Sequence, residues 1–193
     1  MSETRILQGP ELIRLDRLLE KYRQGQNKFG EMIVGPAWVN LMIEKITGGG
    51  EKAMVLVEDE RVAGFILFKT GKRSILASLV YVEDVEEREK LLAELVSEFR
   101  DEFWQKSIVF PEPLPDMEIE DQKRLFAEAG FEIMERYKME YSTRYEITAP
   151  KRPEGITLKK YSRLLDQNIT VLDKRAYKNH PDERIIDILT DIG

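Results

Sequence analysis

The sequence predicts an α+β domain in which helices flank a mixed, mostly antiparallel central sheet. Two observations carry this prediction. Three strand-like segments follow one another between residues 53 and 82, and short polar turns separate them, which is typical of antiparallel hairpins. The third segment, at 75–82, is followed by a long amphipathic helix and a further short strand. That order predicts a right-handed crossover, which makes the two strands parallel.

The composition of the 193-residue chain excludes several functional classes. The absence of cysteine rules out disulfides, thiolate nucleophiles and cysteine-bound metals. The net charge of −6 argues against a nucleic-acid partner, because nucleic-acid-binding proteins present a basic face. The lack of cysteine also suits a cytoplasmic protein, which we expect. No apolar run approaches the roughly 20 residues of a membrane span, so no membrane partner is expected. A single histidine and scattered carboxylates give no ligand spacing, so no metal is predicted.

The first quarter of the chain alternates between strand and helix signals. Leu12, Leu15, Leu19 and Tyr22 recur at the spacing of one helix face, and three glycines at 48–50 end the helix after it. In chain order we expect a strand at Arg5–Gln8, a helix at Pro10–Arg23, a loop at Gln24–Gly35 and a helix at Ala37–Ile46.

The central segments follow the same two periodicities. The near-continuous apolar character of 75–82 indicates a strand buried on both faces. Gly130 is placed to end a helix, and the alternation after it suits an outer antiparallel strand. In chain order we expect strands at 53–57, 62–69 and 75–82, a helix at 91–103, a strand at 108–110, a helix at 118–129 and a strand at 131–142.

The C-terminal segment repeats the opening pattern of the chain. Residues 148–154 have the composition of a linker, and 155–193 then give a strand, a helix, a loop and a second helix. We therefore expect one domain at 1–147 and the partial start of a second, similar domain at 155–193. Because half a domain exposes its apolar helix face, this tail must pack on the first domain or form a homodimer.

The order of elements over residues 4–145 resembles the GNAT superfamily, the Gcn5-related N-acetyltransferases. Two segments carry the resemblance most specifically. Arg124–Glu132 (RLFAEAGFE) looks like the late helix that ends in a glycine-phenylalanine step. Ser78–Val96 aligns without gaps to the strand, phosphate loop and helix that bind the cofactor in that family.

The resemblance implies transfer of an acyl group from acetyl-CoA or another acyl-CoA to a small-molecule or peptide amine. In such enzymes the fourth and fifth strands separate to admit the cofactor, and its pyrophosphate lies on backbone N–H groups at the start of the long helix. The positions that this implies for cofactor binding are Leu79, Val80, Tyr81, Val82, Lys90, Leu91 and Leu92.

The chain departs from the family pattern at several functional positions. Glu87, Lys90 and Leu92 stand where the phosphate loop has a donor and two small residues, so the side chains of Lys90 and Leu92 are expected to project where phosphate oxygens would lie. Segment 83–90 holds five acids against two bases. Lys90 is either a counter-charge for phosphate or a solvated helix residue. Phe126 replaces the usual tyrosine acid and is expected to pack in the core.

Two functional hypotheses therefore stand side by side. The first is a GNAT-like N-acyltransferase, and the second is a noncatalytic GNAT-fold binding or scaffolding module, the degenerate half of a tandem protein. Each candidate side chain likewise has a catalytic and a structural interpretation. The candidates are Glu83 or Asp84 as a base, Tyr137 and Tyr141 as substitute proton donors, His180 as a base, Trp38 and Trp104 in the core or a groove, and Phe29–Gly35 beside the acceptor.

Overall fold

The computed structural model describes residues 2–29, 35, 37–83, 87–110, 114, 117–134, 171–172, 175–179 and 183–192. The chain divides into two compact units, one formed by residues 1–133 with 184–193 and the other by 134–183. The predicted division into a domain at 1–147, a linker at 148–154 and a second, partial domain stays a prediction, as does a homodimer through 155–193.

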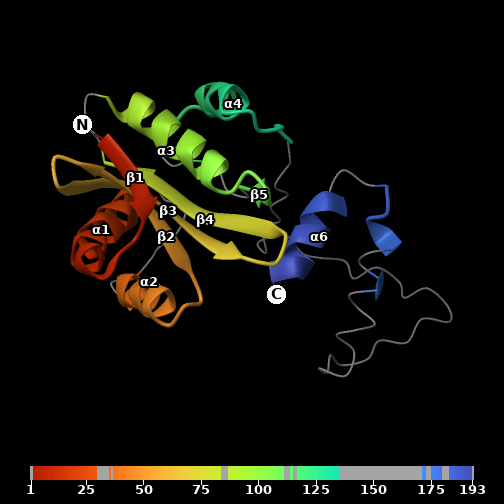
Figure 1. Cartoon of the computed structure of the whole chain (residues 1–193), viewed down its shortest axis with the longest axis horizontal. Coiled ribbons are helices and arrows are strands. Elements are labelled where there is room, and N and C mark those ends of the chain that lie inside the picture. The colour runs from red at the N-terminus through yellow and green to blue at the C-terminus, as the bar shows by residue number, and fades with distance from the viewer. Residues whose placement is uncertain are drawn as a thin grey trace, which may run out of the picture. The chain divides into compact units, whose positions relative to one another are not determined.

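A five-stranded sheet in the order β1-β2-β3-β4-β5 forms the centre of the first unit (Figure 1). The first four strands are antiparallel neighbours, and β4 and β5 are parallel. The strands are β1 at Ser2–Ile6, β2 at Lys52–Glu58, β3 at Arg61–Thr70, β4 at Ser74–Val82 and β5 at Ser107–Val109. Both predicted features of the sheet, the antiparallel run and the crossover, are confirmed.

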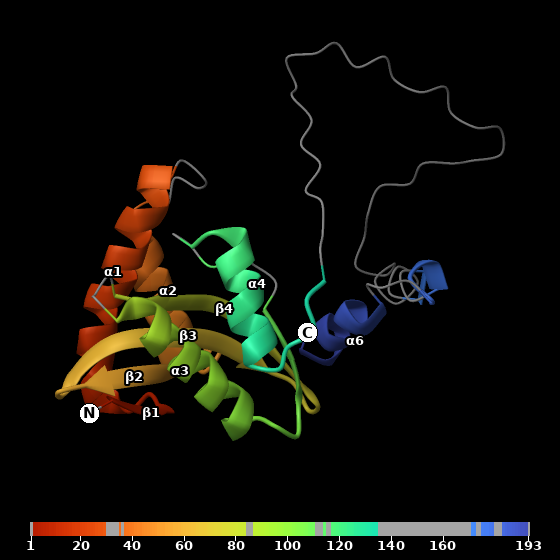
Figure 2. The same cartoon turned by 90° about the horizontal axis from the view of Figure 1, so that it is seen from above.

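Helices cover both faces of this sheet, as Figures 1 and 2 show. A 3-10 turn, η1, leads into α1, which packs with α2 on one face, whereas α3 and α4 lie on the other. The helical elements are η1 at Gly9–Glu11, α1 at Leu12–Phe29, α2 at Ala37–Thr47, α3 at Arg88–Glu102, α4 at Ile119–Glu128 and α6 at Glu183–Ile192.

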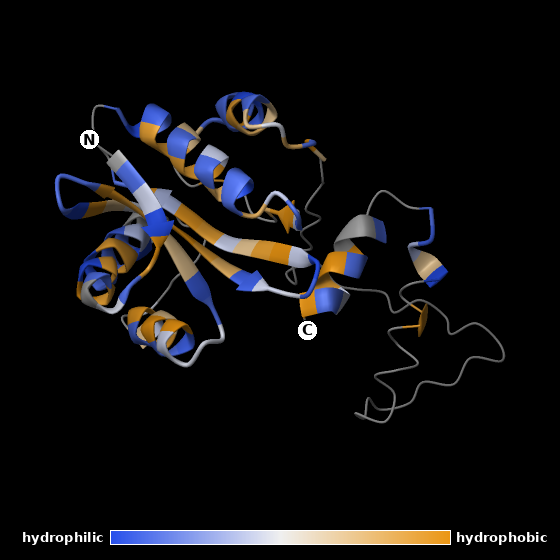
Figure 3. Cartoon of the chain, in the orientation of Figure 1, coloured by the Kyte–Doolittle hydropathy of each residue, from blue (hydrophilic) through white to orange (hydrophobic). Residues whose placement is uncertain are grey.

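Two hydrophobic cores separate the sheet from its helices. Alternate residues of β3 point to opposite faces, so Phe65 and Leu67 meet α1 and α2, while Ile66 and Phe68 meet α3. Figure 3 shows the apolar strands enclosed between helices whose outer faces are polar. This alternation fixes which face each side chain of β4 can reach.

Several sequence-based expectations are wrong in the described residues. The first strand lies at Ser2–Ile6 instead of Arg5–Gln8, because its pairing with β2 ends at Ile6. The first helix, α1, runs to Phe29 instead of ending at Arg23. Arg23 Nε and Gln24 Nε2 both donate to the Glu20 carboxylate, at 2.8 and 2.9 Å, and such contacts stabilise the last turns of a helix. The single glycine at position 25 costs only about 1 kcal/mol in a helix and does not end it.

Two further errors concern aromatic residues. Trp104 is 73% exposed, because its neighbour Phe103 takes the inward position against Phe68 and Phe99. Residues 131–134 do not form a strand, and the rest of the predicted strand at 131–142 lies outside the described residues. Phe131 instead closes the end of α4, where its N–H donates to the Phe126 carbonyl at 2.9 Å.

The Glu20 contacts predict an unusual titration. The hydrogen bonds from Arg23 and Gln24 lower the pKa of Glu20 from 4.5 to about 2. Because the pKa in the folded state is depressed, the stability that this group contributes is present above about pH 4.5 and is lost as the pH falls towards 2. In a carboxyl NMR titration, Arg23→Ala should return the Glu20 pKa towards 4.5, and Arg100→Ala should not. A wild-type Glu20 that titrates near 4.5 would contradict this.

The start of β4 is covered by α6. Asp191 Oδ2 accepts a hydrogen bond of 2.9 Å from the Arg73 backbone N–H, and this bond lowers the pKa of Asp191. A Cβ atom added at Gly71 would lie 2.7 Å from the Asp191 carbonyl oxygen. Gly71→Ala should therefore displace α6 and raise amide hydrogen exchange over 184–192, while Gly9→Ala, which meets no atom within 4 Å, should leave it unchanged. Equal exchange in the two variants would refute this placement of α6.

Candidate functional site

The parallel pair of β4 and β5 is much shorter than β4 itself. Only Ser74, Ile75 and Leu76 pair with β5, although β4 continues to Val82. Among the described residues, no strand pairs with this edge of β4 beyond Leu76. The edge therefore offers free backbone groups to an extended ligand.

The pairing with β3 indicates which groups this edge presents. Glu83 donates its backbone N–H to the Ala63 carbonyl in β3, at 2.8 Å. Because successive residues of an antiparallel strand point their N–H and C=O groups to opposite sides, Val82 and Val80 direct theirs away from β3. The side chains of all four predicted cofactor-binding residues of β4, Leu79 to Val82, pack in the two cores, so their contribution to a ligand is the backbone.

The N-terminus of α3 follows β4 at the same end of the sheet. The side chain of Glu87, the N-cap residue, makes no capping hydrogen bond, and Leu91 donates the first helical N–H to the Glu87 carbonyl at 3.0 Å. The N–H groups of the three residues before Leu91 have no acceptor within the helix. Together with the helix dipole, they favour a negatively charged group.

The side chains at this helix start differ from the sequence-based expectation. Leu92 is 2% exposed and lies in the core with Leu91, so its side chain does not project towards a phosphate as expected. Lys90 pairs with Glu87 at 2.7 Å on the surface. The pair lowers the pKa of Glu87 and raises that of Lys90. Arg88, which sequence reasoning did not single out, is half-buried at the first position of the helix.

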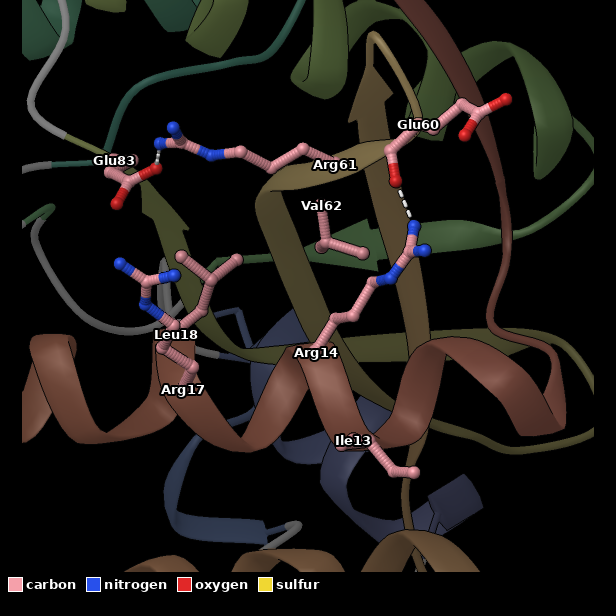
Figure 4. Close-up of a pocket in the computed structure, with 8 residues that line it drawn as sticks. All are labelled: Ile13, Arg14, Arg17, Leu18, Glu60, Arg61, Val62 and Glu83. Carbon is pink, nitrogen blue, oxygen red and sulfur yellow. Dashed lines mark hydrogen bonds and ion pairs between the residues drawn. The ribbon is translucent and has the colours of Figure 1, made fainter.

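Glu83, the predicted candidate base, is a buried member of an ion-pair cluster. It is 6% exposed. One carboxylate oxygen pairs with Arg61 of β3, as Figure 4 shows, and the other pairs with Lys21 of α1. Both oxygens thus contact cations, which gives the carboxylate a structural role. The cluster fastens the end of β4 to α1.

Phe126, where the family's acid would stand, packs in the core as predicted. Its ring centroid lies 4.9 Å from that of Phe110 and 5.7 Å from that of Phe131. Trp38 stacks on Tyr22 at 5.8 Å beneath α1. The remaining candidates lie outside the described residues, and their predicted roles stay predictions: Tyr137, Tyr141, Asp84, His180 and most of Phe29–Gly35.

Gln122, a buried residue of α4 that the sequence did not indicate, fixes the segment before that helix. Its amide accepts from the Leu114 N–H at 2.9 Å and donates to the carbonyls of Leu114 and Met117, at 3.0 and 2.7 Å. A polar residue on the inward face of an amphipathic helix is the signal that could have identified it.

Replacing Gln122 tests whether its three hydrogen bonds to Leu114 and Met117, here called the Gln122 clamp, stabilise the fold. Gln122→Leu removes three hydrogen bonds and leaves buried backbone groups unpaired, so the free energy of unfolding should fall by about 1–3 kcal/mol. Gln105→Leu, at an exposed turn position, should change it by less than about 0.5 kcal/mol. Urea denaturation measures both. Equal stabilities would show that the clamp contributes nothing.

No group of three or more histidine, cysteine, aspartate or glutamate side chains that could hold a metal ion occurs among the described residues. In the same part of the chain, no helix combines the length and the apolar character that crossing a membrane requires.

A mixed five-stranded sheet, a short β4–β5 pair and a helix that starts at the open end of β4 define the fold of the GNAT acyl-CoA N-acyltransferases, and this chain has that fold. No protein-family model and no curated protein matches the sequence.

Solved structures similar to this chain include several acetyltransferases. A probable acetyltransferase is 13% identical, with a TM-score of 0.53, over 72% of this chain and 98% of its own. AAC(6')-Iy, solved with the bisubstrate analogue CoA-S-monomethyl-acetylneamine, is 13% identical, with a TM-score of 0.51, over 74% and 98%. A ribosomal-protein-alanine N-acetyltransferase of Brucella melitensis biovar Abortus 2308 is 17% identical, with a TM-score of 0.50, over 73% and 99%.

Proposed function

We propose that this chain is an N-acyltransferase that takes its acyl group from acetyl-CoA or a related acyl-CoA. One observation carries the proposal: β4 leaves β5 after Leu76 and presents a free edge that ends beside an uncapped helix N-terminus. An extended ligand arm with a phosphate at one end matches that combination. Coenzyme A has this shape, and when bound it supplies an acyl group as a thioester.

The described residues fit such a cofactor through their backbone. Val80 and Val82 direct peptide groups to the open edge, and the first N–H groups of α3 are available to phosphate oxygens. The charges of residues 87–90 cancel, with two acids and two bases. The Glu83 carboxylate does not add to them, since it is neutralised by Lys21 and Arg61. We propose that Arg88 provides the positive charge beside the phosphates.

We further propose an amine as the acyl acceptor, either a small molecule or a peptide. Two similar structures support these two kinds of amine: AAC(6')-Iy with its acetylneamine analogue and the ribosomal-protein-alanine N-acetyltransferase. Tyr137 and Tyr141 stay our candidates for a proton donor, because the side chains of Glu83 and Phe126 are engaged elsewhere.

A noncatalytic GNAT-fold binding module is the second candidate function. The specific observation in its favour is that both expected acid-base positions have structural roles. Phe126 has no proton to donate, and Glu83 has both oxygens in ion pairs. Such a module would keep the fold and lack acyl transfer.

Calorimetric titration with acetyl-CoA tests the first proposal. We expect saturable binding at micromolar to millimolar concentration, at least tenfold weaker binding by Arg88→Gln because a charge-assisted hydrogen bond is lost, and unchanged binding by Arg124→Gln on the surface of α4. Glu87→Arg should bind more tightly, since a negative charge beside the phosphates is reversed. No binding at millimolar acetyl-CoA would refute the proposal.

A second assay separates the two candidate functions. Release of free thiol from acetyl-CoA is followed with a panel of aminoglycosides, polyamines and peptides with free N-termini. Acetylation of any amine by the wild type, lost in Arg88→Gln, supports the enzyme. Saturable acetyl-CoA binding without turnover across the panel supports the noncatalytic module.

A further inference from the structure

A second polar site lies on the α1 face of the sheet, apart from the β4 edge. It is a pocket of about 300 Å³ between α1, the β2–β3 turn and the end of β4 (Figure 4). It is lined by Ile13, Arg14, Arg17, Leu18, Glu60, Arg61, Val62 and Glu83. Nothing in the proposed acyl transfer uses this pocket.

Cations dominate the charged groups around this pocket. Arg14 and Arg17 rise from α1 towards the β2–β3 turn, and Arg61 extends from β3 to Glu83. Arg14 Nη1 donates to the Glu60 backbone carbonyl, while the Glu60 carboxylate points away from the pocket. Arg14 and Arg61 are therefore each held by a partner, the Glu60 carbonyl and the Glu83 carboxylate.

Arg17 differs from the other cations. Its guanidinium group points into the same space, and no other described residue forms a hydrogen bond or ion pair with it. Lys21, one turn further along α1, pairs with Glu83 from the adjoining side. Three arginines and two glutamates thus line the pocket, and Lys21 adjoins it, so positive side chains outnumber carboxylates here in a chain whose net charge is −6.

A surplus of positive charge in one concavity attracts anions and repels itself when empty. Planar guanidinium groups match the oxygens of a phosphate or sulfate group in pairs, which favours such a group over chloride. The apolar side chains of Leu18 and Val62 form part of the wall and can contact a small organic body. The volume lies at the lower end of the range for small-molecule sites.

From this arrangement we infer that the pocket binds a phosphate-type dianion, carried by a small phosphomonoester or present as free phosphate. Arg17 and Arg14 contact the anion. Glu83 acts as a positioning residue, because its ion pairs hold Arg61 and Lys21 beside the anion. This site is separate from the proposed coenzyme A groove, because it lies on the α1 face and its cations come from α1 and β3.

NMR titration of the full chain at constant ionic strength tests the inference. Inorganic phosphate should cause saturable shifts in the amides of residues 13–18 and 60–62, with a dissociation constant on the order of 1 mM. Arg17→Gln should weaken binding at least about tenfold, since one charge-assisted contact is lost. Arg124→Gln, a matched arginine on α4, should leave it unchanged. Equal shifts in both variants, or no saturation, would overturn the inference.

Two further titrations identify the source of the anion and test whether the pocket is independent of the coenzyme A site. Tighter binding of glycerol 3-phosphate than of inorganic phosphate assigns the site to a phosphomonoester, and the reverse order assigns it to free phosphate. The affinity for acetyl-CoA should be the same in Arg17→Gln and in the wild type. A loss there would make the pocket part of the coenzyme A site and would refute a separate anion site. Failure of acetyl-CoA to bind at all leaves the phosphate titration unaffected.

Discussion

Phe99→Ala is expected to lower the free energy of unfolding by about 3–5 kcal/mol, the usual cost of removing a fully buried phenylalanine. Phe99 lies on the inner face of α3 with no exposed surface. Its ring centroid is 5.1 Å from those of Phe68 and Phe103 and 5.9 Å from that of Phe110. The substitution therefore removes three aromatic contacts and opens a cavity where β3, α3 and the end of β5 meet.

The matched control for this prediction lies five residues further along the chain. Trp104→Ala also removes a large aromatic side chain, but Trp104 is mostly exposed, so stability should change by less than about 0.5 kcal/mol. Chemical denaturation monitored by circular dichroism measures both variants. A loss that is similar for Phe99 and Trp104 would mean that α3 is not seated on the sheet as described. Because α3 carries the proposed phosphate-binding N-terminus, Phe99→Ala should also weaken acetyl-CoA binding.

Glu83→Leu is expected to cost about 1–3 kcal/mol, because it leaves Lys21 and Arg61 without the carboxylate that both of them contact. The cost stays below that of breaking a fully buried pair, since both cations reach solvent. Glu98→Leu, an exposed glutamate in the middle of α3, is the matched control and should be near neutral.

A double-mutant cycle separates the structural role of Glu83 from a role as a base. If the ion pair is the reason for the loss, Arg61→Leu added to Glu83→Leu should cost less than the sum of the two single changes. A base without a structural role gives additive, near-zero changes in stability. That outcome would contradict the cluster and restore Glu83 as the leading candidate for proton abstraction.

Much of the sheet could be predicted from local patterns. The strands of the 53–82 segment and the crossover to β5 lie where their alternation and apolar runs predicted them. Hydrophobic periodicity is a property of neighbouring residues, so it survives without knowledge of distant contacts. The buried Phe126 was predictable for the same reason, because it occupies the inner face of an amphipathic helix.

The candidate site was less predictable, since its properties depend on partners that are remote in sequence. An acidic residue after a strand looks like a candidate base until Lys21 of α1 and Arg61 of β3 are brought to it. The cations of the α1 pocket do leave a local trace. Arg14, Arg17 and Lys21 recur at intervals of three and four residues, which places them on one face of a helix. The pattern could not say that this face meets the β2–β3 turn.

The sequence by itself determined the α+β class, the antiparallel strands of the 53–82 segment and the crossover, because apolar periodicity and turn residues act locally. Only the tertiary structure decided that β4 leaves β5 after Leu76, that Leu92 is buried, and that Glu83 belongs to an ion-pair cluster. These three facts depend on long-range packing, since the neighbours of a side chain or a strand edge are chosen by the way the helices lie on the sheet.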